Sequence, residues 1–96
     1  AELKAPLRQG LVTPGVREAC ARVIGAVGDR DLSTLIEDHL DDPDEDFRLS
    51  AGDALVRCRN ARGIPLLVGC LKSPHGSTRT IAAAALKKLN RGMDLG

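Results

Sequence analysis

The sequence predicts an all-α protein in which pairs of helices stack into a solenoid of about six helices. Three observations carry this prediction: a register of roughly 31 residues that repeats along the chain, apolar residues at helical spacing within each unit, and Gly or Pro where one helix should end. No segment shows the alternation of apolar and polar residues that is typical of a half-buried strand.

The repeat is clearest when Val16-Arg17, Phe47-Arg48 and Thr78-Arg79 are superimposed, since each step is 31 residues. The register then holds without a gap, and small or apolar residues match at nearly every internal position. The matching sets include Cys20, Ala51 and Ala82; Val23, Ala54 and Ala85; Ile24, Leu55 and Leu86; and Val27, Cys58 and Leu89. Such a register indicates repeated structural units rather than chance.

The N-terminal segment joins the same frame with a shift of 29 residues, which places Leu3 on Leu32 and Leu7 on Ile36. The two missing residues fall in the loop after Pro14. We therefore expect one domain over residues 1–96, either complete or a fragment of a longer array. Its expected parts are a half repeat at 1–15, full repeats at 16–46 and 47–77, a half repeat at 78–91 and a tail at 92–96.

The first full unit shows how each repeat divides into two helices. Apolar residues between Val16 and Val27 follow the i, i+3, i+4, i+7 pattern of an amphipathic helix. Gly28 stands where a C-cap glycine would lie. Asp31 is the expected N-cap of the second helix, which should end before Pro43 because the residue preceding a proline is disfavoured in helices.

The remaining helices follow the same logic. Asp44 is the expected N-cap of a long helix that extends to Cys58. Residues 62–72 form its short partner, and residues 77–89 form the last long helix. Neither helix of a unit can bury its apolar stripe alone, whereas stacked pairs can, and small residues such as Ala51 and Ala54 permit close approach.

Composition excludes several classes of function. Phe47 is the only residue among Phe, Trp and Tyr, so stacking on bases or flat cofactors has almost no support. No apolar run approaches the ~20 residues of a membrane span, so we expect no membrane association. Residues 1–48 carry a net charge of −5 and residues 49–96 carry +6. This layout suggests self-association through oppositely charged ends, or is a matter of chance.

Residues that could carry chemistry are scattered. Cys20, Cys58 and Cys70 form no CxxC pair, and we expect them to be reduced, buried and not zinc ligands. His39 and His75 stand alone, without a nucleophile or an orienting group in a known motif. We therefore predict no catalytic residues, no metal and no cofactor. The odd number of cysteines fits the cytoplasm, and the composition hints at a bacterial source.

The segment from Asp42 to Pro74 resembles a known family. Asp42-Pro43, Phe47-Arg48, Ala54-Leu55 and Leu66-Leu67 match the short HEAT-like repeats first associated with phycobilisome lyases. The resemblance covers almost the whole chain and implies a right-handed α-α superhelix. It says less about function, because the fold hosts scaffolds, lyase subunits and a few enzymes.

The resemblance also implies a ladder of Asp and Arg between repeats. Asp42 and Arg48 match it, while Ser73 stands where the next Asp would precede Arg79. We therefore interpret Arg17, Arg48 and Arg79 as structural, with a row of ligand-binding arginines as the alternative.

In HEAT arrays the second helices line the concave, partner-binding face. We therefore predict a non-catalytic scaffold that binds a protein of unknown identity there. The alternatives are a subunit or fragment of a bilin-lyase-like enzyme and, less favoured, a nucleic-acid-binding module. The candidate partner-binding residues are Arg8, Ser33, Thr34, Glu37, Asp38, Asp41, Ile64, Val68 and Lys72.

Overall fold

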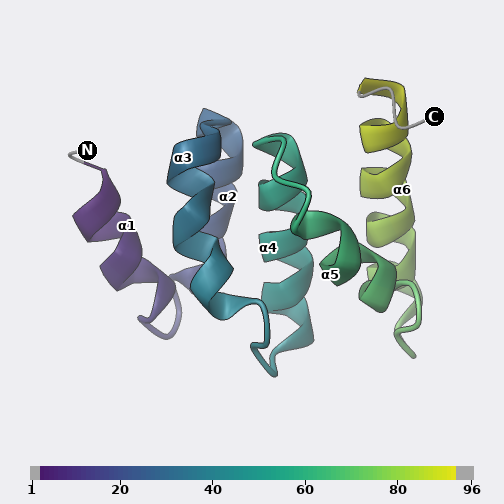
Figure 1. The fold of residues 1–96 in the computed structure, drawn as a ribbon. Coiled ribbons are helices and arrows are strands. Elements are labelled where there is room, and N and C mark those ends of the chain that lie inside the picture. Colours follow the sequence, from purple (N-terminus) through teal and green to yellow (C-terminus); the bar gives the residue numbers. More distant parts are fainter. Residues whose placement is uncertain (1–2, 93–96) are drawn as a thin grey trace.

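A computed structural model describes the backbone of residues 3–92 and the side chains of residues 3–89. It consists of helices alone within that range, which confirms the predicted all-α class (Figure 1). A short α-helix, α3, continues directly into a 3₁₀-helix, η1, so the two together form one of six helical segments. In chain order the elements are α1 (Lys4–Leu11), α2 (Arg17–Val27), α3 (Arg30–Ser33), η1 (Thr34–His39), α4 (Glu45–Arg57), α5 (Gly63–Cys70) and α6 (Gly76–Gly92).

The helices lie in two layers. α2, α4 and α6 pack side by side, and α1, α3–η1 and α5 form the second layer (Figure 1). We call the outward surface of α2, α4 and α6 the first-helix face, and that of α1, α3–η1 and α5 the second-helix face. Each helix of one layer contacts helices of the other, which is the arrangement that buries two amphipathic stripes at once.

The turns between helices repeat along with the helices. Asp29 accepts a hydrogen bond from the backbone N–H of Asp31, and Asn60 accepts the corresponding bond from Arg62. Asp44, the predicted N-cap of α4, accepts from the N–H two residues later in the same way. Asp29 and Asp44 thereby satisfy N–H groups that a helix start leaves free, whereas Asn60 bonds to the N–H of Arg62, the residue before α5.

Several helix bounds differ by a few residues from the prediction, while the C-cap of α2 agrees with it. Asp29, rather than Asp31, caps α3, because Asp29 has the extended backbone of a cap and Asp31 already lies in the first turn. Gly28 ends α2 with φ of 73°, as predicted for a C-cap glycine. Helix α6 is longer than predicted and includes Gly92, and the rest of the expected tail, residues 93–96, lies outside the described residues.

The change from α3 to η1 has a local cause. The Ser33 hydroxyl donates to the carbonyl of Arg30 at 2.6 Å, and the Thr34 hydroxyl donates to that of Asp31 at 2.7 Å. Hydroxyl groups that bond back along a helix disturb its regular ladder, and the tighter 3₁₀ turn is the usual local result.

The core lies between the two layers and is aliphatic, with Phe47 as its largest fully buried side chain. Small residues set the distance between helices, as predicted. A Cβ added to Gly25 of α2 would lie 3.0 Å from the Cα of Ala54 in α4. The close approach of α2 and α4 replaces the volume that aromatic side chains supply in other cores.

The three cysteines are free, and Cys58 and Cys70 are buried as predicted, while Cys20 is half-buried. Burial raises the pKa of both the Cys58 and the Cys70 thiol, which keeps them protonated and poorly nucleophilic. Separately, none of the helices in the described part of the chain is both long and apolar enough to cross a membrane.

Candidate protein-binding face

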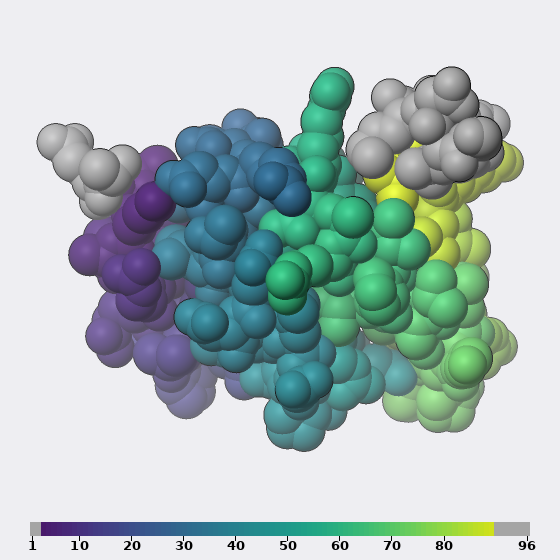
Figure 2. Space-filling view, in the orientation of Figure 1, coloured from purple at the N-terminus to yellow at the C-terminus, as the bar shows by residue number. Residues whose placement is uncertain are grey.

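The predicted partner-binding residues are distributed along the second-helix face, and most of them are accessible. Figure 2 shows this face as one continuous surface from α1 through η1 to α5. The exposed members of the predicted set are Arg8, Thr34, Asp38, Asp41, Val68 and Lys72.

Two members of the set do not face outward as predicted. Ser33 is fully buried, with 0% of its surface exposed. Ile64 is half-buried and packs against the apolar cluster that includes Leu67 and Ala82. Both predictions are wrong for the same reason: each residue is covered by the next repeat, which a helical pattern within one unit does not reveal.

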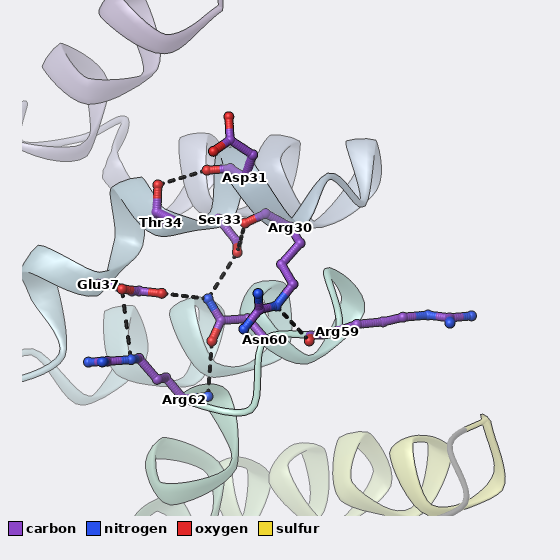
Figure 3. Close-up of polar contacts among 8 residues, drawn as sticks. All are labelled: Arg30, Asp31, Ser33, Thr34, Glu37, Arg59, Asn60 and Arg62. Carbon is purple, nitrogen blue, oxygen red and sulfur yellow. Dashed lines mark hydrogen bonds and ion pairs between the residues drawn. The ribbon is translucent and has the colours of Figure 1, made fainter.

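Glu37 is accessible only in part, because it belongs to a polar cluster centred on Asn60 (Figure 3). The Asn60 amide, itself buried, donates to the Ser33 hydroxyl at 3.0 Å and to a Glu37 carboxylate oxygen at 2.7 Å. The other Glu37 oxygen lies 3.8 Å from Nε of Arg62. Glu37 therefore joins η1 to the start of α5 and is less free to bind a partner than Asp38 or Asp41.

Asn60 is the residue of this face that the sequence analysis missed. The sequence holds a signal for it, because Asn60 lies 31 residues after Asp29 and each side chain accepts a hydrogen bond from the N–H two residues later. A second contact, from Nε of Arg30 to the carbonyl of Arg59 at 3.2 Å, links the same two turns (Figure 3).

The outward side of α5 is apolar. Pro65, Val68 and Gly69 are exposed, and Leu71 is exposed just beyond the helix. Lys72 follows, and on the same face lie the carboxylates of Asp38, in η1, and of Asp41, just after η1. An apolar strip beside free charges is typical of a protein-binding surface.

The four residues predicted to form a ladder lie at the turns between repeats. Arg17 donates to the carboxylate of Asp42, and Arg48 donates through Nη1 to the carbonyl of Asp42 at 2.7 Å. Arg79 makes the equivalent bond to the carbonyl of Ser73, at 2.6 Å. All four are thus engaged within the chain.

The junction that contains Ser73 uses different residues from the one that contains Asp42. The Ser73 hydroxyl donates to Glu45 at 2.8 Å, and Nδ1 of His75 lies 3.1 Å from the same Glu45 oxygen. Position 73 has no carboxylate, and Glu45 at the start of α4 brings one to this junction, where it contacts Ser73 and His75.

Both junction carboxylates favour their ionised forms. Burial raises the pKa of Asp42, but bonds from the Asp44 N–H and the Arg17 guanidinium outweigh it, so the net pKa lies below the ordinary 3.8. The Ser73 hydroxyl, followed by His75, lowers the pKa of Glu45 below its ordinary 4.5 despite partial desolvation. Because unfolding restores the ordinary values, these groups stabilise the fold above the ordinary pKa values and lose that contribution as the pH falls through the lowered ones.

We therefore expect the free energy of unfolding to decline as the pH is lowered from about 5, and the decline to be less steep in Asp42→Asn. Urea denaturation followed by far-UV circular dichroism at a series of pH values measures this slope. The amide also weakens the bond to Arg17 at every pH, so the slope, not the absolute stability, is the readout. Equal slopes in the two proteins would contradict the role given to Asp42.

The first-helix face carries a separate open hollow of about 510 Å³ above α4. Its lining combines apolar side chains, among them Leu49, Ile81 and Ala84, with acidic and basic ones. Because acidic and basic side chains both line the hollow, its charge does not indicate a particular class of ligand.

Both histidines contact side chains of the fold. The His39 ring packs edge-on against Phe47, with 5.9 Å between ring centroids, and His75 is bound to Glu45 in a turn. The described residues contain no group of three or more His, Cys, Asp or Glu side chains that could hold a metal ion.

Comparison with protein families decides the identity of the fold. A family model of HEAT repeats matches residues 5–87, nearly the whole chain. The chain belongs to the HEAT repeat family. HEAT repeats are generally non-enzymatic scaffolds and commonly mediate interactions between proteins. A comparison with curated proteins found no match.

Proposed function

We propose that this HEAT-repeat chain is a non-catalytic scaffold that binds a protein partner on its second-helix face. The observation that carries the proposal is the exposed apolar side of α5, around Val68, on the same face as the free carboxylates of Asp38 in η1 and Asp41 just after it. An apolar segment with basic residues, such as an amphipathic helix of the partner, has the matching chemistry.

Contacts within the chain support a smaller set of partner-binding residues. Asp38 and Asp41 are exposed and make no hydrogen bond or ion pair to the other described side chains, so they can pair with a basic partner without breaking the fold. Glu37 and Ser33 hold Asn60 instead. We therefore assign partner binding to Asp38, Asp41 and Val68, and we assign interface rim positions to Arg8, Thr34 and Lys72.

The two alternatives receive no specific support. A surface that stacks on nucleic-acid bases uses exposed aromatic rings, and Phe47 is buried. The three free cysteines are in keeping with a reducing compartment, and a bacterial cytoplasmic setting stays part of the proposal.

The proposal is tested with the double variant Asp38→Lys/Asp41→Lys. Proteins captured from a lysate of the source organism by the wild-type chain are purified, and their affinity for both forms is measured by isothermal titration calorimetry. We expect at least about a tenfold loss of affinity, which is ~1.4 kcal/mol of binding free energy.

The matched control is Glu18→Lys/Asp53→Lys, which makes the same change of charge on the first-helix face. This control should bind like the wild type. Equal losses in both variants would indicate a general charge effect, and an unchanged affinity in the first variant would refute the assignment to the second-helix face.

A further inference from the structure

Gly69 lies on the outward side of α5, and the fold of the described residues does not explain why it is glycine. Its φ is not positive, so its backbone conformation does not require glycine. A Cβ added at Gly69 would meet nothing within 4 Å. Glycine also destabilises a helix relative to alanine, so the chain loses stability at this position without any gain in packing.

Other glycines of the helices lie where a second helix comes close. At four of them, an atom of another helix lies 3.1 Å or less from the place that a Cβ would occupy. Gly69 has no such neighbour. Gly76 also has an open environment, but it is the first residue of α6, where the helical hydrogen bonds are not yet complete. The four glycines with close neighbours are Gly10, Gly25, Gly52 and Gly63.

The open space at Gly69 does not depend on where the sequence ends. In repeat register the counterparts of Gly69 are Asp38 of η1 and Gln9 of α1. Each of these has the following repeat packed against its helix, and each is still exposed. A further repeat after α6 would therefore leave Gly69 open as well, so the helix that comes close to Gly69 is not the next helix of the solenoid.

We infer that Gly69 is the point at which an α-helix of the partner crosses α5 in close contact. This inference rests on the proposed function, because it uses the same face. Without a Cβ at Gly69, the axes of the two helices can approach to about 8 Å, the lower end of the usual range. The partner helix then needs a small residue, such as Gly, Ala or Ser, at the crossing. Pro65 and Val68 are exposed beside Gly69 and would contact its apolar flanks.

Charge complementarity makes the partner helix basic on the side of η1. The α3–η1 segment lies beside α5 in the second layer (Figure 1), and Asp38 holds the register position of Gly69 there. Asp38 and Asp41 are exposed and unpaired among the described side chains. Neighbouring helices lie about 8–10 Å apart, and a helix rises about 1.5 Å per residue. A Lys or Arg about seven residues from the small residue would therefore reach Asp38.

A phage-displayed library of helical peptides tests the inference. Each peptide has about five helical turns, and every residue type is allowed on one side of the helix. Peptides selected on the complete chain should carry a small residue and, about seven positions away, Lys or Arg. Isothermal titration calorimetry with the synthesised peptides should show about a tenfold loss of affinity for Gly69→Ala. Gly69→Leu should bind them more weakly still.

Two measurements separate this role from a structural one. Gly69→Ala should raise the melting temperature, because its Cβ meets nothing within the chain, so its loss of affinity cannot come from unfolding. Ala26→Leu adds apolar bulk at an exposed position of α2 and should bind like the wild type. If peptides lose affinity for Asp38→Lys/Asp41→Lys but bind Gly69→Leu normally, the close crossing is refuted while the proposed function stands. A library without peptides that respond to either change would overturn both.

Discussion

Replacement of Phe47 by alanine is expected to lower the free energy of unfolding by about 3–5 kcal/mol. Phe47 is 0% exposed and is the largest fully buried side chain of the core. The Arg17 guanidinium lies over its ring, 4.1 Å from the centroid, and His39 contacts its edge. Alanine would leave a cavity and would also remove the aromatic face on which this cation rests.

Urea denaturation gives the free energy directly, provided that the dependence on denaturant is the same in both proteins. Phe47→Leu is the matched control, because it keeps most of the volume and loses the ring; we expect it to cost under about 1.5 kcal/mol from packing. An alanine variant within about 0.5 kcal/mol of the wild type would contradict the packing described for Phe47.

The position of Phe47 also shows what the sequence can predict about this fold. In the repeat register its counterparts are Val16 and Thr78, and the pattern correctly places all three near the start of a first helix. The pattern does not indicate which of the three side chains is buried. Val16 is exposed, whereas Phe47 is enclosed by the preceding repeat. Whether a side chain is buried in a solenoid depends on the neighbouring repeats. Periodicity within one repeat therefore predicts the helix, but not which of its side chains the next repeat buries.

The candidate binding face shows the same limit. The sequence places Ser33 and Glu37 on the outward side of a second helix, but the amide of Asn60 reaches both from the following turn. Asp38 and Asp41, one and four positions beyond Glu37, stay exposed as predicted. Asn60 and Ser33 are 27 positions apart in the sequence. A contact between residues so far apart cannot be predicted from the spacing of apolar residues within a single helix.

The two glycines of α5 should respond in opposite directions to the same substitution. Alanine normally stabilises a helix by about 0.5–1 kcal/mol relative to glycine, and neither Gly63 nor Gly69 has a positive φ that would oppose it. At Gly69 an added Cβ meets nothing within 4 Å, so Gly69→Ala should gain that amount. At Gly63 the Cβ would lie 2.6 Å from the carbonyl oxygen of Gly52 and 2.8 Å from the Cβ of Leu55.

These neighbours of Gly63 belong to the backbone and the rigid base of α4, so they cannot move aside cheaply. Gly63→Ala should therefore force α5 away from α4 and cost about 1–3 kcal/mol in spite of its better helix propensity. Thermal or urea unfolding of the two variants and the wild type measures whether each substitution raises or lowers the free energy of unfolding. Stabilisation by both alanines would mean that α4 and α5 are farther apart than described. The sequence presents Gly63 and Gly69 as equivalent positions of one short helix, and only the approach of α4 gives them opposite roles.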